Sequence, residues 1–327
     1  MGEREARGPF ASLPELCRRV GPARVNRRVL EALIRAGSLD ALGPGRAALM
    51  AGLEQALQGG EQSARSSEAG QHDIFGITAA HDARPAAGAA AVAEWPASVR
   101  LAGERETLGL YLTGHPIAPY EQDLRWFATA RIGECAAERP AGAIDPARAW
   151  AEARHVTLAG LILEVRRRAA RVSFLLDDRS GRMEVTMYEE VYQRHRELIV
   201  KDALVQVEGA LRFDEFSDSW RLAARQISLL EQVRERLARS LMLRWPRGAR
   251  APELLAALQS VLLRHRGGPC SVLLRYHGEV ASGTLAFGPD WKVRASNELL
   301  EQLELLLGPG GARFGYGEPG AASSAMA

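Results

Sequence analysis

Two groups of arginines are the residues of this sequence whose type and spacing point most directly to chemistry. Seven arginines lie between positions 154 and 182 against three carboxylates, and six lie between positions 15 and 35 against two glutamates. A guanidinium binds phosphate oxygens through paired hydrogen bonds and stacks on flat rings. Formal net charge is only +2, so a basic surface for nucleic acid must be local. The candidate phosphate-binding residues are Arg24, Arg27, Arg28, Arg46, Arg166, Arg167, Arg168, Arg171, Arg179 and Arg182.

Aromatic side chains near the second group are candidates for base stacking, which contributes about 1–3 kcal/mol per base where it occurs. They are Phe174, Phe213, Phe216 and Trp220. Phe174 is in phase with apolar neighbours two residues away, which favours a place in a core. Phe216 and Trp220 flank a polar loop, and we expect them to be exposed.

The elements that position these residues have strand period. Asp177–Gly181 carries the Asx, Ser and Gly residues of a turn between two strands. Asp177 and Asp178 are therefore interpreted as turn formers rather than metal ligands. Five strands with a helix after the third are typical of an OB-fold barrel, which binds single-stranded nucleic acid. The predicted strands are 156–165, 172–177, 183–185, 203–211 and 220–227, with a helix at 189–199.

Residues 14–58 read as helices with tight connections. Asn26 can cap a helix with an inward stripe of Val29, Leu30, Leu33 and Ile34. Pro44, after Gly43, begins the next helix, and Arg46 lies at the N-terminus of that helix. A free helix N-terminus beside an arginine can receive a phosphate. An ordinary helical pair with solvated arginines is the alternative.

A Gly-, Ser- and Ala-rich linker follows at 59–100 and contains one peptide, Gln71-His-Asp-Ile-Phe75, that could dock into a hydrophobic pocket of a partner. The alternative is that Ile74 and Phe75 pack on neighbouring helices.

Residues 104–112 predict a helix with Leu108, Tyr111 and Leu112 inward, ended by Gly114-His115-Pro116. His115 has no catalytic partner nearby, which favours a structural role. Residues 128–153 read as a second connection.

The C-terminal part predicts a small α+β domain and a disordered tail at 318–327. Its predicted strands are 241–245, 271–277, 284–287 and 291–295, with helices at 252–264 and 297–307.

The 327 residues are enough for two or three domains. The three cysteines are far apart and support neither a disulfide framework nor a zinc site. The charged start and the lack of a long apolar run favour a cytoplasmic protein.

Four blocks in one order resemble the C-terminal third of the alpha subunit of bacterial DNA polymerase III, the replicative polymerase. They are Val25-Asn-Arg-Arg-Val-Leu-Glu-Ala-Leu-Ile-Arg-Ala-Gly-Ser-Leu-Asp40, Leu42-Gly-Pro-Gly-Arg-Ala-Ala-Leu-Met50, Gly103-Glu-Arg-Glu-Thr-Leu-Gly-Leu-Tyr-Leu-Thr-Gly-His-Pro-Ile117 and Leu176-Asp-Asp-Arg-Ser-Gly-Arg-Met-Glu-Val185.

This resemblance implies a role for each part. Residues 25–50, with a hairpin at 36–43, match a helix-hairpin-helix region that grips duplex backbone, which adds Gly43 to the DNA-binding candidates. Gln71, Asp73, Ile74 and Phe75 fit the sliding-clamp peptide of that family. The barrel would handle single-stranded template, and the terminal domain would bind the tau subunit of the clamp loader. The first connection of the barrel is shorter than is usual in the family.

Polymerase chemistry needs carboxylates that hold two metal ions, and in this family they lie upstream of the matched blocks. We therefore expect no catalytic residue and no cofactor here, with Mg²⁺ needed only in the absent active site. The chain would be a fragment, a split gene product or a gene model begun at an internal methionine. The alternatives are a stand-alone OB-fold protein for single-stranded DNA or RNA and the error-prone relative of the same subunit.

The expected fold class is multidomain α+β: a helix-hairpin-helix region, a five-stranded OB-fold barrel and a small C-terminal α+β domain. The expected domains are 1–58 for backbone binding, 59–100 for the linker, 101–153 for a helical connection, 154–232 for the barrel, 233–317 for the tau-binding-like domain and 318–327 for the tail.

Overall fold

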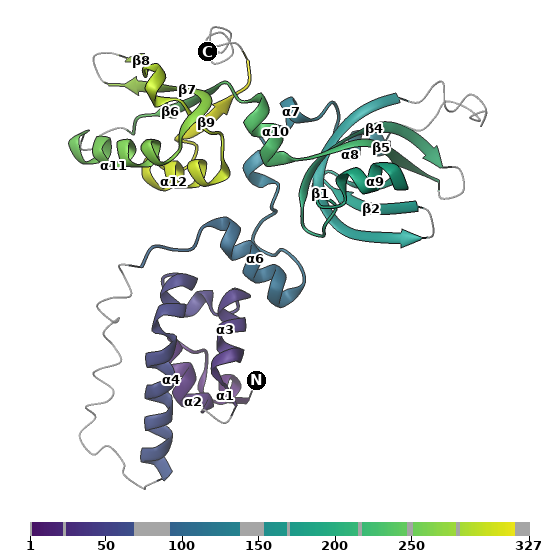
Figure 1. Ribbon diagram of the computed structural model, residues 1–327. Coiled ribbons are helices and arrows are strands. Elements are labelled where there is room, and N and C mark those ends of the chain that lie inside the picture. The colour runs from purple at the N-terminus through teal and green to yellow at the C-terminus, as the bar shows by residue number, and fades with distance from the viewer. Residues whose placement is uncertain are drawn as a thin grey trace. The chain divides into compact units, whose positions relative to one another are not determined.

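The computed structural model shows a chain made of two compact units, residues 1–115 and 116–327 (Figure 1). The residues that it describes are 2–21, 24–68, 92–137, 154–168, 171–214, 218–246, 251–278 and 282–317. Within these ranges, no helix combines the length and the apolar character that a bilayer crossing requires.

The first unit is helical. Side chains at two positions cap its early helices: Ser12 accepts from the amide of Glu15, and Asn26, as predicted, accepts from the amide of Val29. Leu16, Leu30 and Leu53 are among the residues that form its core. Its helices are α1 (Gly2–Arg7), α2 (Leu13–Val20), α3 (Arg27–Arg35), α4 (Arg46–Glu68) and α6 (Ala97–Leu108), with a 3₁₀ turn at Asp40–Leu42.

Several local predictions for this unit are wrong. Helix α4 begins at Arg46 rather than Pro44 and continues to Glu68, and α6 begins at Ala97, so both ends of the predicted linker at 59–100 are helical. Val29 is 41% exposed while Leu30 and Ile34 are buried. Helix α6 ends at Leu108 because Gly109 takes a left-handed φ of 77°, a conformation that glycine adopts at little cost. The residues after Gly109 therefore do not continue the helix, and Leu112 is exposed rather than inward. Leu108, the last helical residue, is also exposed.

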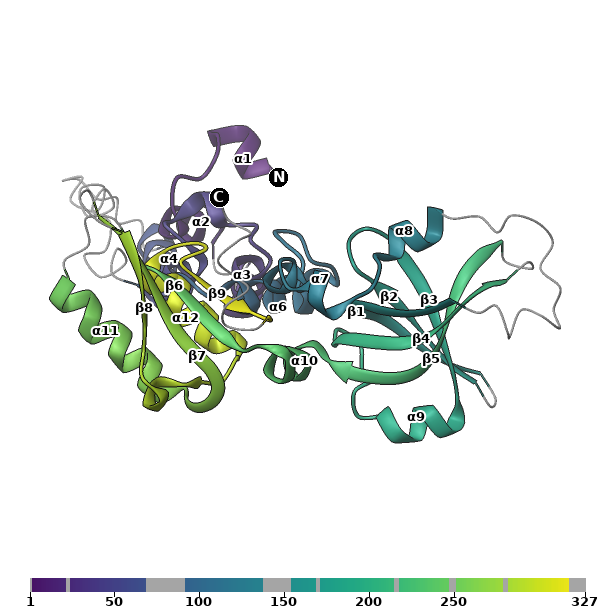
Figure 2. The same cartoon turned by 90° about the horizontal axis from the view of Figure 1, so that it is seen from above.

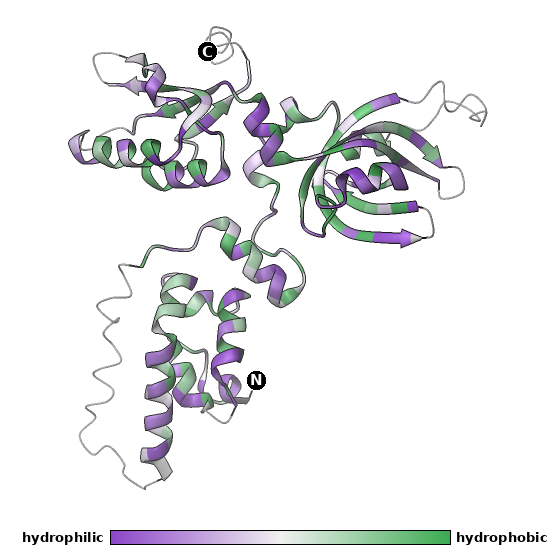
Figure 3. Ribbon diagram, viewed as in Figure 1, coloured by the Kyte–Doolittle hydropathy of each residue, from purple (hydrophilic) through white to green (hydrophobic). Residues whose placement is uncertain are grey.

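The second unit contains a closed barrel in the order β1-β2-β3-β5-β4, which confirms the predicted five strands and helix. Polar and apolar residues alternate along its strands (Figure 3), and the inward residues, among them Phe174 and Leu222, form one core. Its elements are β1 (Arg154–Arg168), β2 (Arg171–Asp177), β3 (Arg182–Tyr188), α9 (Glu189–His195), β4 (Leu204–Asp214) and β5 (Ser219–Leu229). A helix that sequence analysis missed, α8 (Ile132–Ala137), lies on the opposite side of the barrel from α9 (Figure 2).

A buried arginine contacts residues on both sides of the junction between the barrel and the rest of this unit. Arg234 lies on α10 (Leu230–Leu237) and is fully buried. Its guanidinium bonds to the Asp123 carboxylate at 2.7 Å and lies 3.9 Å from the centre of the Tyr120 ring. A 3₁₀ turn (Ala118–Tyr120) and α7 (Leu124–Phe127) complete this junction, whose core includes Tyr120 and Phe127.

The C-terminal domain is a four-stranded sheet in the order β8-β7-β6-β9. Its predicted helices are confirmed, and Ser296 caps the second one. The predicted strand at 291–295 is wrong, because a 3₁₀ turn precedes it and only Val293 makes isolated bridges. Sequence analysis missed the last strand. The elements are β6 (Ser240–Arg244), α11 (Ala251–Arg264), β7 (Arg266–His277), β8 (Ser282–Ala286), a 3₁₀ turn (Pro289–Trp291), α12 (Asn297–Leu307) and β9 (Ala312–Gly315).

Candidate nucleic-acid interface

Three of the predicted phosphate-binding arginines surround the start of α3. Arg24 and Arg28 are exposed. Arg27, whose side chain is 68% exposed, forms an ion pair with Glu31 one turn later at 2.8 Å. The first turn of α3 therefore presents guanidinium groups to solvent, as a surface that contacts phosphates requires.

Arg46 has a different place from the one predicted. Its side chain is only 3% exposed, and its guanidinium bonds to the carboxylates of Asp40 and Glu104 at 2.9 Å each. The hydrogen bond with Asp40 is the largest cause of a raised pKa for Arg46. The group is engaged inside the helical unit, so the structure gives Arg46 a role in packing.

A carboxylate occupies the helix N-terminus that the sequence predicts as a phosphate site. The amides of Arg46 and Ala47 donate to the two oxygens of Glu94 at 2.6 and 3.1 Å. Burial opposes the charge on Glu94, but these amides and that of Trp95 outweigh it and lower its pKa. Gly43 takes an extended conformation, and an added Cβ would lie 2.7 Å from Leu49, so close packing accounts for this glycine.

The arginines at the end of β1 do not form one cluster. Arg166 is exposed and bonds to Glu164 at 2.8 Å, whereas Arg167 lies over the Tyr192 ring of α9 at 4.4 Å. Successive strand residues point to opposite sides, which separates these neighbours. Arg168 pairs with Arg171 across the β1–β2 hairpin, and Arg171 is exposed.

Tyr188 is the aromatic residue that sequence analysis missed. It pairs with Arg171 across β2 and β3, and it is 56% exposed. Its position at the end of a strand, in phase with polar Glu184 and Thr186, is the signal that could have identified it. We call Arg166, Arg171 and Tyr188 the outer barrel site: an exposed ring beside exposed guanidinium groups on the barrel surface.

Arg179 and Arg182 lie at the other end of the same hairpin, about 20 Å away along a seven-residue strand. Arg182 pairs with Asp177 at 2.8 Å, and Arg179 with Glu121 at 3.8 Å. The Asp177 carboxylate accepts a hydrogen bond from the amide of Arg179. The buried Asp178 carboxylate accepts hydrogen bonds from the amides of Ser180 and Gly181. The interpretation of both aspartates as turn formers is confirmed.

The predicted aromatics divide between core and surface. Phe174 is 1% exposed and belongs to the barrel core, as predicted. The rings of Phe213 and Trp220 pack edge to face, with their centres 5.3 Å apart. Trp220 is half-buried against the barrel core rather than exposed as the sequence predicts. Phe216 lies outside the residues that the structure describes, as do Gln71, Asp73, Ile74 and Phe75 of the predicted docking peptide.

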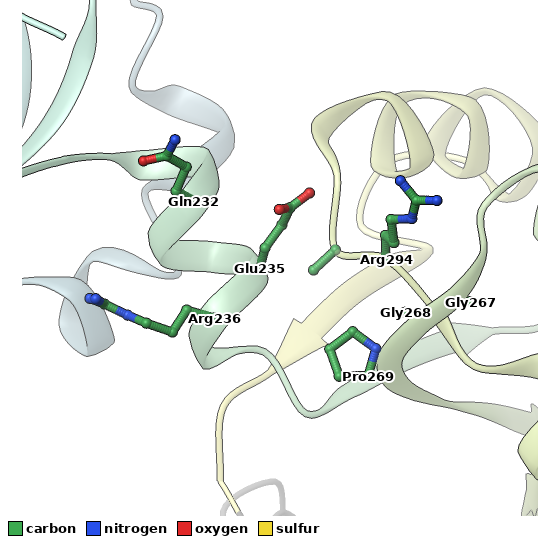
Figure 4. Close-up of a pocket in the computed structure, with 8 residues that line it drawn as sticks. Gln232, Glu235, Arg236, Gly267, Gly268, Pro269 and Arg294 are labelled. Atoms are coloured by element: carbon green, nitrogen blue, oxygen red, sulfur yellow. The ribbon is translucent and has the colours of Figure 1, made fainter.

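A cavity of about 420 Å³ lies between α10 and the C-terminal domain (Figure 4). Glu235 of α10 points toward Arg294 across it, and the backbone of Gly267 and Gly268 forms another wall. All three cysteines are buried, and none of them forms a disulfide. In the described ranges no group of three His, Cys, Asp or Glu side chains could hold a metal ion.

Comparisons with family models match three parts of the chain. Residues 1–49 match the helix-hairpin-helix motif, residues 156–230 match the OB-fold nucleic acid binding domain, and residues 257–308 match the C-terminal domain of DNA polymerase III alpha. The expected α+β fold class, with these three components, is confirmed.

Several curated relatives are named DNA polymerase III subunit alpha. The chain is 37% identical to that of Vibrio cholerae over 306 residues, and 39% identical to that of Pseudomonas aeruginosa over 317 residues. These alignments cover 92% and 90% of this chain but 25% and 26% of the relatives. The Escherichia coli K12 protein is 37% identical over 307 residues, with the same 92% and 25% coverage. The chain thus spans about a quarter of the length of the relatives it matches.

Two solved structures are weakly similar to part of this chain. The S. pombe Stn1-ten1 complex gives a TM-score of 0.21 at 18% identity, covering 23% of this chain and 57% of that chain. A replication protein A heterotrimer bound to ssDNA gives 0.20 at 19% identity, covering 23% and 56%. Similarity at this level carries no information on function.

Proposed function

Because this chain corresponds to the C-terminal portion of bacterial DNA polymerase III alpha subunits, we propose that it is the non-catalytic part of such a subunit in chromosome replication. In this role it binds duplex backbone and single-stranded template, and it tethers the polymerase to the sliding clamp and the clamp loader. The carboxylates that hold Mg²⁺ for nucleotide transfer would belong to the upstream part of the polymerase.

The observation that carries the DNA-binding proposal is the outer barrel site. Arg171 and Tyr188 are paired neighbours on adjacent strands, so a phosphate at the guanidinium brings the adjoining base toward an exposed ring. Stacking tolerates every base because each has a π-face. The site therefore suits a template strand whose sequence changes continuously.

The helical unit supports contact with duplex backbone through Arg24, Arg27 and Arg28. Phosphate contacts fix position without reading sequence, as a polymerase that copies any template requires. Arg46 would act indirectly, by holding Asp40 and Glu104 in place.

The clamp and clamp-loader parts of the proposal rest on sequence and homology. Gln71, Asp73, Ile74 and Phe75 supply an amide, an acid and two adjacent apolar anchors, the arrangement of a peptide that docks into a preformed pocket. Residues 257–308 match the model of the C-terminal domain of the family, and this match supports an assignment of that domain to tau.

Fluorescence anisotropy with a labelled oligothymidylate tests the barrel. Replacing Arg171 and Tyr188 by alanine should weaken binding by about tenfold or more, since a phosphate contact and a stacking contact are both lost. Arg225, an exposed arginine of β5, provides the matched control. Equal affinities of the double variant and Arg225→Ala would overturn the assignment of the outer barrel site.

A second experiment separates the replicative role from a stand-alone nucleic-acid-binding protein. Ile74→Ala with Phe75→Ala should abolish binding to the sliding clamp and leave the affinity for oligothymidylate unchanged. If the unaltered chain does not bind the clamp, the stand-alone alternative is favoured.

A further inference from the structure

The C-terminal sheet has one covered and one open face. Leu241 and Leu243 of β6 are fully buried in a core that includes residues of α11 and α12, such as Leu262 and Leu303. The alternate residues of β6 point the other way: Ser240 is buried, Met242 is half-buried and Arg244 is exposed. We call this second face, which is exposed at the Arg244 end, the open face.

Three adjacent strands each place one arginine on the open face. Arg244 of β6 pairs directly with Arg275 of β7, and Arg313 of β9 pairs with Met242, two residues before Arg244. Neighbouring strands lie about 4.8 Å apart, so the three arginines lie on adjacent strands of one face, with Arg313 two residues along the sheet from the Arg244–Arg275 pair. We call Arg244, Arg275 and Arg313 the arginine row.

No carboxylate within the strands faces this row. The register places only uncharged side chains and His277 beside the arginines, and Asp and Glu are absent from all four strands. Burial, and then the charges of Arg244, Arg275 and Arg125, lower the pKa of Arg313. The three arginines therefore concentrate positive charge on this face, as a surface that contacts phosphates requires.

The row encloses a recess that fits an anionic oxygen. Met242, Arg244, Arg275, Gly310, Gly311 and Arg313 line it, and its volume is about 20 Å³. This is about the room that one water molecule needs. A phosphate oxygen could enter the recess and meet guanidinium groups from three strands.

An exposed aromatic residue near the row indicates which anion it suits. Trp126 of α7 is 49% exposed, lies 6.0 Å from the ring of Tyr316, which follows β9, and carries Arg125 at 5.7 Å from its own ring. Arg125 is also close enough to Arg313 to affect its titration. Cations beside a solvent-exposed indole match a strand of alternating phosphates and bases better than a peptide of Asp and Glu alone, which has no ring to stack.

We propose that the open face of the C-terminal sheet is a second binding site for single-stranded nucleic acid, separate from the outer barrel site. The arginine row holds the phosphates, and Trp126 stacks on a base. This places a strand-binding surface on the same domain that we assign to tau.

The test uses the full chain carrying Arg171→Ala and Tyr188→Ala, so that loss of the barrel site and failure of this proposal are distinguishable. In this background, Arg244→Ala with Arg275→Ala should weaken oligothymidylate binding by about tenfold and reduce the slope of log K against log[salt] by about 1.4, because each single-strand phosphate contributes about 0.7. The matched control is Arg264→Ala, an exposed arginine of α11.

Trp126→Ala should weaken binding without changing the salt slope, because stacking releases no counterion. Circular dichroism melting checks that each variant is folded. Equal affinity of the Arg244/Arg275 variant and the Arg264→Ala control would overturn the proposal. So would a polyglutamate peptide that binds as tightly as oligothymidylate and is insensitive to Trp126→Ala, since the face would then be a site for acidic peptides.

Discussion

Replacing Glu104 by glutamine should remove a pH-dependent part of the stability of the helical unit. Glu104 is fully buried, and its oxygens accept hydrogen bonds from the Arg46 guanidinium, the Thr113 hydroxyl and the amides of Leu112 and Thr113. Burial opposes the charged form, but these donors outweigh it and lower the pKa of Glu104 from 4.5 to about 2.

The size and sign follow from proton linkage. A pKa lowered by one stabilises the charged native state by about 1.4 kcal/mol, so the Glu104 carboxylate contributes about 3 kcal/mol to the free energy of unfolding at neutral pH. Because folding lowers the pKa, this contribution is complete above 4.5 and is lost as the pH falls toward 2. About 2 kcal/mol should already be lost at pH 3.

Urea unfolding of the whole chain, followed by pulsed hydrogen exchange and mass spectrometry, resolves this unit through peptides from α3, α4 and α6. At pH 7, Glu104→Gln should lower the free energy of unfolding of these peptides by about 3 kcal/mol, and the variant should lose less stability than the parent on going to pH 3. Glu106→Gln on the same helix is the control. Its side chain is 66% exposed and pairs with Arg35, so its loss should stay below about 1 kcal/mol. Equal losses in the two variants, or an unchanged pH profile in Glu104→Gln, would refute the reasoning.

Three more substitutions test other contacts. Arg234→Met leaves the Asp123 carboxylate without its buried partner and should destabilise the second unit by about 3–5 kcal/mol, measured by urea unfolding against exposed Arg236→Met. Gly209→Ala places a Cβ 2.3 Å from the carbonyl oxygen of Ala223 and should cost about 1–3 kcal/mol, seen as a lower barrel melting temperature; an unchanged temperature would count against this packing. Glu94→Gln removes a carboxylate from the start of α4 and should cost about 1 kcal/mol, detected as faster hydrogen exchange of the α4 amides, with no change expected in β3.

The arginine candidates show where reasoning from sequence succeeds. Arg24, Arg28, Arg166 and Arg171 are exposed, as expected for residues in a polar connection, in the first turn of a helix and at strand ends. Strand alternation, a local property, also explains why Arg166 and Arg167 point apart and why Phe174 is in the core.

Arg46 shows the limit. Its carboxylate partner Glu104 is 58 residues away, and the Glu94 carboxylate that fills the neighbouring helix N-terminus is 48 residues from Arg46. No local pattern encodes such pairs, so an arginine at a helix start reads as exposed until its distant partners are known. The exposure of Leu112 likewise depends on the backbone conformation of Gly109.

By itself, the sequence determined the order of most helices and strands, the barrel and the position of its turn, because periodicity, caps and turn residues act over a few neighbours. Only the tertiary structure decided which arginines meet solvent and which meet carboxylates, and it alone brought Arg244, Arg275 and Arg313 together on one open face. Those outcomes depend on contacts between residues far apart in the chain, whose burial and charge are set by strand register and packing rather than by local sequence.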